Sequence, residues 1–377
     1  MNNDKRANSH ARLNFLWLMA TSLIIAGMSL RICQMAQCFV FGADHVNRPI
    51  PEMLLYLGIW FIAYFLALER IRGMSHSDPH KINFIWVLGV SVFIRIVFFP
   101  PHLIQETDPY RYLWDGQAVI QGANPYRLSP QEAYVLEVSP ARNRDSSVSA
   151  TFERINFPDV KTIYPPLAQY LFAGSQYLTP WSLLGWKWMI ITADILILFV
   201  LSDLLARLKI RSEWLLLYAW SPLILKEFYN SMHLDIFALF FLCLVIYGLA
   251  RKWTTFSFLA LACAVMVKWF ALILLPLLIR ATWRTPKQAA LNIGLFFGLM
   301  ALLYLPFASA GHSLWEGLMT FSLRWKVNAG LFSLISFFFQ SLSLSEDLVR
   351  LSSRMTIALI FAAISIFVMR SFWNKRD

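Results

Sequence analysis

The chain has 377 residues, of which 58% are hydrophobic and only 15% are charged. This composition excludes an ordinary soluble domain, in which roughly a quarter of the residues are charged and cover the exterior. The net charge of +11 comes from small Lys and Arg clusters at the ends of apolar runs, which disfavours nucleic-acid binding and is typical of a multi-pass membrane protein. We therefore expect an all-α bundle of about ten transmembrane helices.

The first three apolar runs cover residues 13–30, 53–68 and 82–99. The first run is too long for the core of a signal peptide, so we interpret it as a retained anchor. Basic residues such as Arg70 and Arg207 flank the runs in a pattern that places both termini in the cytoplasm, as in a protein of the inner (plasma) membrane. The four cysteines lie in or beside apolar runs and are expected to be free thiols.

A long segment at residues 100–181 follows the third run and is expected outside the cytoplasm. Thr107 or Asp108 suits a helix N-cap, with Pro109 at the first helical position, and Gly122 predicts where the helix ends. Asp108, Arg111 and Asp115 fall on one face of this helix. These side chains either cap and pair within the helix or form a catalytic face. Carboxylates gathered at the mouth of a membrane span favour the catalytic interpretation, with Asp108 and Asp115 as candidates.

Two tyrosines occupy special positions later in this segment. Tyr126 ends a turn that begins at Gly122, and Tyr164 precedes a Pro-Pro pair that leads into a short interfacial helix at 167–178. Tyrosines at such depths either anchor the chain at the membrane interface or stack on a sugar ring. Tyr126 and Tyr164 are therefore candidate substrate-binding residues.

A second outward segment joins the predicted spans 214–228 and 236–250 and is rich in polar side chains. Ionisable groups at membrane depth are costly and suggest a functional site, although Lys226 and Glu227 could also simply pair and extend toward the interface. The candidate substrate-binding residues of this segment are Glu227, Asn230, His233 and Asp235.

Basic residues flank both ends of the paired apolar runs 254–267 and 269–279, which predicts an up-and-down hairpin with Lys268 at its tip. Lys268, Arg95 and Arg324 each either extend toward the interface or bind a lipid phosphate. The run at 330–341 is too short to span a membrane and is expected on the outer face. Further spans at 182–202, 288–307 and 354–370 complete the predicted bundle.

The order of these pieces resembles the GT-C superfamily of integral-membrane glycosyltransferases, particularly bacterial polyprenyl-phosphomannose-dependent mannosyltransferases. The resemblance covers roughly residues 85–310, within a core predicted at 82–310 that follows two helices in 1–81 and precedes an outer loop and final helix in 311–377. The pieces that carry it are Asp108, the Gly122–Tyr126 turn, the Tyr164–Leu167 stretch, the Asn230–Asp235 segment after Ser221-Pro222, and Lys268 before an apolar run ending at Pro276.

The resemblance implies transfer of a hexose, with mannose as the superfamily's example, from a polyprenyl-phosphate-linked donor to a hydroxyl of a glycan, lipid or protein acceptor. The reaction would take place on the extracytoplasmic side, among membrane lipids, with inversion. No cofactor is indicated by the sequence, which leaves a divalent metal open. An alcohol is a poor nucleophile and needs a general base, here Asp108. The phosphate leaving group needs cations. The cations expected to bind the donor phosphate are Lys268, Arg111 and Arg324.

Three other functions compete with this one. A lipid or solute transporter would also be polytopic, but neither repeats nor broken helices in matching halves are visible. A metal-dependent hydrolase of lipid phosphates would use a ligand set whose spacing matches no strict metal motif. A non-catalytic membrane scaffold is the third. The ligands of the hydrolase would be Glu106, Asp108, His233 and Asp235.

Overall fold

The computed structural model describes residues 2–42, 48–74, 80–100, 102–104, 106–141, 146–282, 285–325 and 330–373. Within these ranges the chain is helical and contains no strand, which confirms the expected all-α class. In chain order the elements are α1 (Asn2–Met35), η1 (Ala36–Phe39), α2 (Ile50–Arg72), α3 (His80–Phe98), α4 (Asp108–Ile120), α5 (Pro130–Val135), α6 (Ser146–Phe152), α7 (Pro166–Leu178), α8 (Leu183–Arg207), η2 (Ser212–Leu215), α9 (Leu216–Ala219), α10 (Pro222–Ile224), η3 (Leu225–Asn230), α11 (Asp235–Ala250), α12 (Thr254–Val267), η4 (Trp269–Leu274), α13 (Leu275–Thr282), α14 (Pro286–Tyr304), η5 (Leu305–Ala310), α15 (Ser313–Arg324), α16 (Gly330–Ser341) and α17 (Glu346–Trp373).

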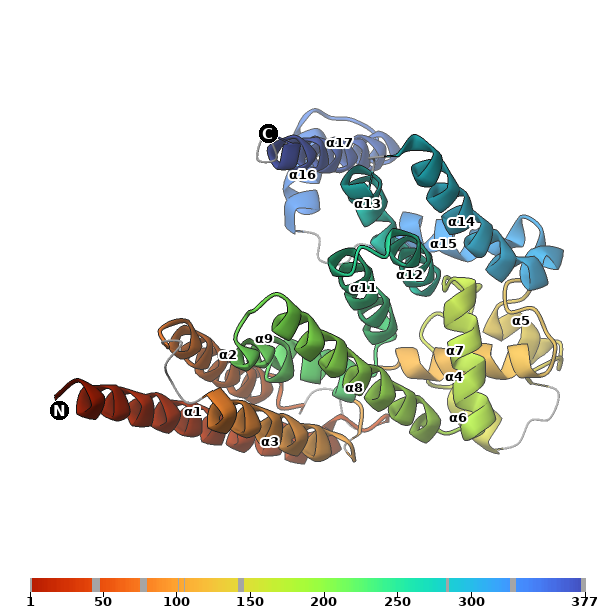
Figure 1. Ribbon diagram of the computed structural model, residues 1–377. Coiled ribbons are helices and arrows are strands. Elements are labelled where there is room, and N and C mark those ends of the chain that lie inside the picture. Colours follow the sequence, from red (N-terminus) through yellow and green to blue (C-terminus); the bar gives the residue numbers. More distant parts are fainter. Residues whose placement is uncertain are drawn as a thin grey trace.

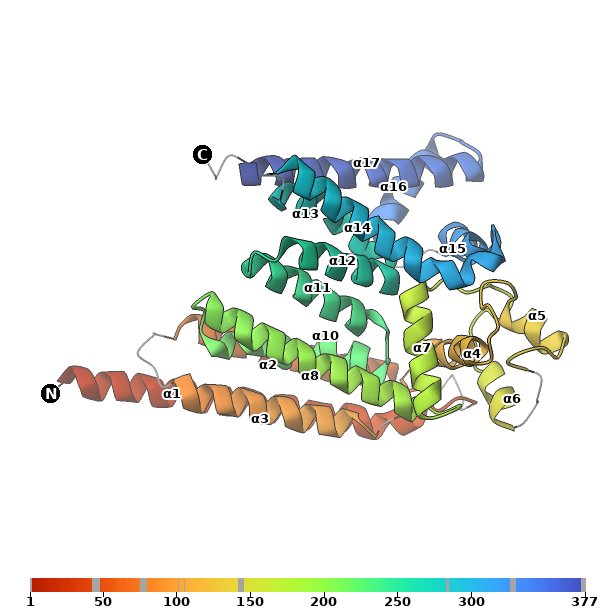
Figure 2. The ribbon, with the colours of Figure 1, turned by 45° about the vertical axis from the view of Figure 1, so that its right-hand side comes forward.

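One group of long helices comprises α1, α2, α3 and α8, which run alongside one another in Figures 1 and 2. On α1 the fully buried residues Leu18, Ile25 and Ile32 recur every seventh position and therefore share one face. The opposite face exposes large apolar side chains, with Leu16 58% and Leu23 67% exposed. Apolar surface of this extent on both long and short helices requires a lipid environment, because water would not tolerate it.

A second group consists of the hairpin of α11 and α12, followed by α13 and α14. Its core contains Phe258, Leu261 and Val265 of α12, which are fully buried against neighbouring helices. The helices α16 and α17 form a further antiparallel pair, which lies beyond α13 and α14 on the side away from α1 and α3 (Figure 2).

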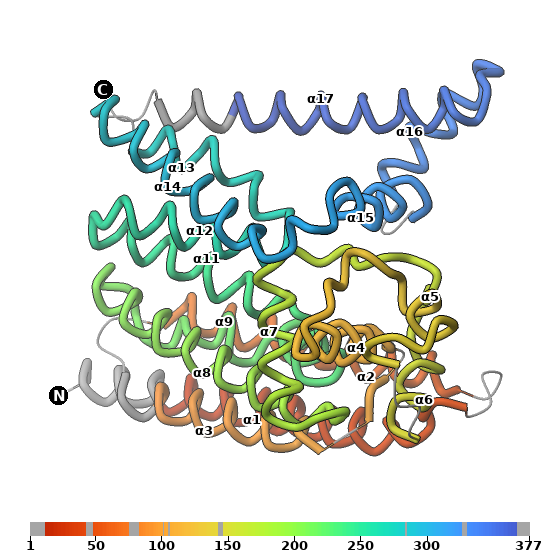
Figure 3. Tube along the Cα trace, turned by 90° about the vertical axis from the view of Figure 1, so that its right-hand side faces the viewer, coloured from red at the N-terminus to blue at the C-terminus, as the bar shows by residue number. Residues whose placement is uncertain are grey.

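The short helices α4 to α7 and α15 gather at one end of the long helices, as Figures 2 and 3 show. We call this the loop end. Here α4 and α7 cross closely at Gly116, where a Cβ atom would lie 2.3 Å from the Phe172 carbonyl oxygen. The rings of Tyr112 and Phe172 stack beside this crossing at a centroid distance of 4.5 Å. The crossing fixes α4, and with it the polar side chains at its start, against the membrane bundle.

Five helices in the described ranges are long and apolar enough to span a membrane. They are Arg12–Phe39, Ile50–Arg72, Leu183–Arg207, Pro286–Ala310 and Glu346–Phe367. Shorter apolar helices, including Asn83–Phe98 and the α11 and α12 hairpin, lie beside them. The count of about ten spans stays a prediction.

The run predicted as one span at 214–228 has a different structure. It is divided into η2, α9, α10 and the π-helix η3, with the interruption at Ser221-Pro222. Proline lacks an N–H group and its ring prevents a continuous α-helix, which explains the break. The result is that Glu227 and Asn230 lie on a short element that ends at the loop end.

Arg95 does not extend to the interface as one interpretation of the sequence expected. It is 8% exposed and donates through Nε to Asp194 Oδ2 at 2.5 Å. The Asp194 carboxylate also accepts hydrogen bonds from the hydroxyls of Tyr218 and Tyr229, at 2.7 and 2.8 Å. This network joins α3 and α8 to the broken segment, so it holds η3 in place.

Candidate active site

The first turn of α4 positions Asp108. Thr107 is the N-cap residue, its side chain makes no capping hydrogen bond, and Asp108 and Pro109 begin the helix. Asp108 therefore does not act as the N-cap, which was the structural alternative to a catalytic role. The helix stops before Gly122, whose φ of +74° is the left-handed conformation that glycine adopts at helix C-termini.

Arg111 and Asp115 form a buried ion pair one turn apart on α4. Arg111 Nε donates to Asp115 Oδ1 at 2.8 Å, and Nη1 donates to the Val160 carbonyl oxygen at 2.9 Å. The remaining nitrogen, Nη2, is buried and has no hydrogen-bond partner among the described residues. The pairing expected between these two residues is present, yet the guanidinium keeps one unused donor.

A cavity of about 330 Å³ opens beside the start of α4, and we call it the donor cavity. It brings four of the predicted site residues together, namely Asp108, Arg111, Tyr164 and Lys268. Its charged lining consists of the cations Arg111, Lys161 and Lys268 and the single carboxylate of Asp108. Each of these cations also pairs with a carboxylate outside the lining, so the cavity offers an anionic ligand charged hydrogen-bond donors and no net positive charge.

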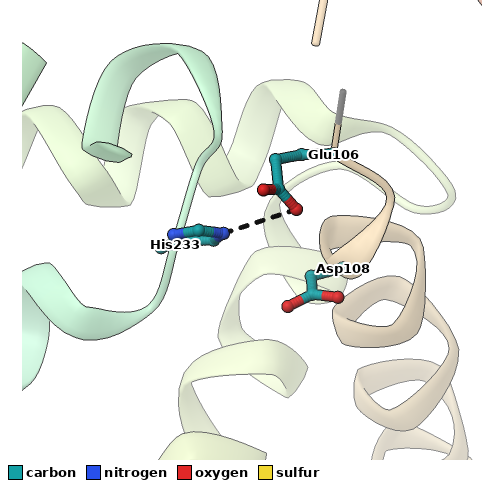
Figure 4. A group of neighbouring side chains, drawn as sticks. All are labelled: Glu106, Asp108 and His233. Carbon is teal, nitrogen blue, oxygen red and sulfur yellow. Dashed lines mark ion pairs between the residues drawn. The ribbon is translucent and has the colours of Figure 1, made fainter. Parts of the chain in front are cut away.

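His233 approaches the same region from the connection between η3 and α11. Its Nε2 lies 3.5 Å from Glu106 Oε2 (Figure 4). Its Nδ1 lies 2.8 Å from Glu227 Oε2. Glu227 thus pairs with His233, while Lys226 donates to the Ser231 hydroxyl at 2.7 Å. No ion pair joins Lys226 and Glu227 in the part of the chain that the structure describes, so the alternative of mutual pairing is wrong.

The electrostatics of this cluster are unusual. Burial, and then the neighbouring Glu106 carboxylate, raise the pKa of Asp108, against the opposing effect of His233 and Lys268. Burial alone would lower the pKa of His233, but hydrogen bonds to Glu106 and Glu227 outweigh it and raise that pKa to about 9. At neutral pH a protonated His233 therefore lies between carboxylates, and Asp108 is a stronger base than an ordinary aspartate.

Glu106, Asp108 and His233 offer one ligand atom each within 4.8 Å of one another. Two carboxylates and an imidazole suit a divalent cation, and Glu227 on the second imidazole nitrogen is the outer-shell partner that such ligands often have. Protonated His233 supplies positive charge at the same place without a metal. Asp235, the fourth residue of the proposed hydrolase ligand set, is not part of this group.

Lys268 lies between α12 and η4, at the tip of the predicted hairpin. Its extended backbone, with φ −155° and ψ 126°, ends α12. Its Nζ donates to both carboxylate oxygens of Asp235, at 2.7 and 2.6 Å. Asp235 thus orients Lys268 along the wall of the donor cavity.

Residues 14–284 match the N-terminal domain of the alpha-(1->6)-mannopyranosyltransferases of the MptA/B family. The chain belongs to this family. It is therefore a glycosyltransferase, which implies a sugar donor and a glycan acceptor, and the transporter and scaffold alternatives are set aside. The match begins within α1, so it includes the two N-terminal helices that the superfamily resemblance left outside. Neither the curated proteins nor the solved structures contain a significant match.

The remaining predicted site residues of this glycosyltransferase lie around the donor cavity without lining it. Asn230 is buried and donates to the His102 carbonyl oxygen at 3.1 Å. Tyr126 is buried against Phe307 and donates to the Tyr164 carbonyl oxygen at 2.7 Å. Arg324 forms an exposed ion pair with Asp159 at 3.2 Å. These contacts position loops and give no direct access to the cavity.

Several residues that line the donor cavity were not predicted from the sequence. Lys161 is one, and its Nζ pairs with Glu316 at 2.6 Å. Phe157 and Trp325 are others, and their rings pack edge to face at 4.4 Å. No motif marks these positions, since only the fold of the long loop against α15 brings them to Asp108.

Proposed function

We propose that this protein transfers mannose from a polyprenyl-phosphate-linked donor to a glycan hydroxyl on the extracytoplasmic side of the inner membrane. The proposal rests mainly on the Asp108 carboxylate, which lines one cavity together with three cations. This cavity lies beside α4, at the loop end of an apolar helical bundle (Figure 2). A donor whose tail lies in the bilayer presents its sugar and phosphate at that depth. The α-(1→6) linkage that the family forms suggests a primary 6-hydroxyl as the nucleophile.

Asp108 is the proposed general base. It accepts no hydrogen bond from another side chain in the described ranges, so its lone pairs are free for the acceptor hydroxyl. Its raised pKa strengthens it as a base. His233 and Glu106 each place a ligand atom within 4.8 Å of an Asp108 carboxylate oxygen.

The donor phosphate is assigned to the cation-rich wall of the donor cavity. Arg111 Nη2 is a buried donor without a partner among the described residues, and a small movement of the side chain toward the cavity would let a phosphate oxygen satisfy it. Lys268, oriented by Asp235, and Lys161 add positive charge where the leaving phosphate develops its charge.

The stereochemistry follows from a single displacement. Inversion that yields an α-linked product requires a β-linked donor. Asp115 is held against Arg111 with 2% of its surface exposed, so it is a positioning residue and not a nucleophile for a retaining reaction.

Purified protein incubated with synthetic β- and α-linked polyprenyl-phosphate mannose and a mannose oligosaccharide tests the proposal. We expect release of polyprenyl phosphate and a new α-(1→6) bond from the β-linked donor only. A chelator should leave the rate unchanged if protonated His233 supplies the positive charge. Absence of transfer from every polyprenyl-phosphate sugar would refute this donor class, and loss of activity on chelation would assign Glu106, Asp108 and His233 to a metal.

A further inference from the structure

A second cavity, of about 340 Å³, lies farther along α4. We call it the distal cavity. Its walls come from the second half of α4, the turn after it, α5, the loop at 138–140 and Ser309 of η5. Its volume falls within the range of small-molecule sites, about 300–1,000 Å³.

The two cavities occupy successive positions along one face of α4. Asp108 and Arg111 line the donor cavity, while Asp115, Ala118 and Gly122 line the distal cavity. These residues follow one another at intervals of three and four, which keeps them on a single stripe of the helix. At 1.5 Å per residue, Asp115 lies about 10 Å along the axis from Asp108. The Arg111–Asp115 ion pair joins a residue that lines the donor cavity to one that lines the distal cavity.

The charges of the two cavities differ. Three cationic side chains line the donor cavity, whereas the distal cavity has one, Arg127, beside Asp115, whose charge is paired with Arg111. The distal cavity therefore offers fewer cationic donors to a phosphate and suits a neutral ligand.

The chemistry of the distal cavity matches a sugar. Trp114, Leu128 and Val138 provide an apolar wall on which the C–H face of a sugar ring can pack. Asp115 provides a carboxylate oxygen for a ring hydroxyl, whereas the Asn124 amide is already hydrogen-bonded within the protein and shapes the wall. Among the described residues, Asp115 Oδ2 accepts a single 3.4 Å hydrogen bond, from Gln169, so it retains acceptor capacity.

The walls are fixed before any ligand binds. Asn124 Nδ2 donates to the Phe307 carbonyl oxygen at 2.9 Å and to Ser309 Oγ at 3.1 Å. Arg127 Nη2 donates to the Ser309 carbonyl oxygen at 2.9 Å. These bonds tie the turn after α4 to η5, more than 180 residues away in the chain. A preformed wall reduces the entropy lost on binding.

We infer that the distal cavity binds the acceptor glycan, holding sugar residues that precede the one presented to Asp108. This inference rests on the proposed function, since it supplies the second substrate of that reaction. An acceptor seated there extends along α4 toward the base, which favours oligosaccharide acceptors over free mannose.

Val138→Trp tests the site, because Val138 lines the distal cavity and is 39% exposed at its rim. Val135→Trp is the matched control, since Val135 is 68% exposed on α5 and lines neither cavity. With linear α-(1→6)-mannotriose as acceptor, Val138→Trp should raise the acceptor KM about tenfold or more and leave the donor KM unchanged. Val135→Trp should leave both unchanged.

Calorimetric titration of mannotriose into the protein without donor separates the two proposals. Binding that Val138→Trp weakens and Val135→Trp preserves supports the distal cavity, even if no transfer occurs and the proposed function fails. Suppose that the wild-type enzyme is active and that Val138→Trp changes neither the acceptor KM nor the binding of mannotriose. That result would overturn the inference and leave the proposed function intact.

Discussion

His233 lies between Glu106 and Glu227, at 3.5 and 2.8 Å, and connects the end of η3 to the start of α4. Only the protonated, positively charged form of His233 attracts both carboxylates. Because hydrogen bonding raises its pKa from 6.5 to about 9, the protonated form stabilises the folded protein. That contribution is complete below pH 6.5 and is lost as the pH rises through about 9.

We expect His233→Gln to lower stability at neutral pH by about 2–3 kcal/mol, the free energy that corresponds to this pKa shift. Thermal unfolding in detergent, measured below and above the pKa of His233, checks the expectation. The difference between wild type and variant should disappear at the alkaline end. A difference that persists unchanged above that pKa would mean that the charge of His233 has no such role.

Lys268 offers a second prediction at this scale. Lys268→Ala should raise the KM for the donor about ten- to a hundredfold, since charge-assisted hydrogen bonds contribute about 1.5–3 kcal/mol. Arg324→Ala removes a cation that pairs with Asp159 and does not line the donor cavity, so it should have a smaller effect. Donor titrations at saturating acceptor make the comparison. Equal donor KM values for Lys268→Ala and wild type would remove Lys268 from the phosphate site.

At the scale of elements, the buried pair of Arg95 and Asp194 joins α3 to α8 within the bundle. Asp194→Ala leaves the Arg95 guanidinium uncompensated, which costs about 3–5 kcal/mol for buried pairs. We predict a sharply lowered melting temperature in detergent. The double variant Arg95→Met with Asp194→Ala should recover part of the loss, because it removes the unpaired charge. If the single and double variants unfold together, the loss has another cause.

The elements differ in how far the sequence could predict them. The start and end of α4 were predictable because Thr107, Pro109 and Gly122 are local signals. The tip of the hairpin at Lys268 was predictable from flanking charges. The break of 214–228 into short helices was missed despite Pro222, because the apolar pattern of that run continues through it.

Contacts between distant parts of the chain could not be predicted in the same way. Arg95 and Asp194 are 99 residues apart, and each alone looks like an isolated charge in a membrane helix. Lys161 reaches the donor cavity only because the loop that carries it packs on α15. The polar residues of the site were recognised by type and position, whereas their pairing depends on tertiary packing.

In the whole molecule, the two ends of the long helices are expected on opposite sides of the membrane. The loop end carries the donor cavity, and the opposite end is expected to face the cytoplasm. Figure 2 shows α8 running from α7 at the loop end toward the far end, where α2 also ends. We predict that Ser146 lies outside the cytoplasm and Lys209 inside, since basic residues favour the cytoplasmic side. Both side chains are exposed.

Ser146→Cys and Lys209→Cys, each in a background without the native cysteines, test this orientation in intact cells. An impermeant thiol reagent should label Ser146→Cys only. Labelling of Lys209→Cys alone would reverse the topology and place the donor cavity on the cytoplasmic side.

Asp108 is proposed to remove the proton from the acceptor hydroxyl. Asp108→Asn keeps the size of the side chain and removes the base, and Asp159→Asn is a matched control at an exposed position of the same loop. The decisive measurement is single-turnover transfer from saturating β-linked polyprenyl-phosphate mannose, together with donor affinity. We predict that Asp108→Asn binds donor normally but reacts about 10²–10⁴-fold more slowly, while Asp159→Asn reacts at the wild-type rate. A folded Asp108→Asn protein with near wild-type turnover would contradict the account.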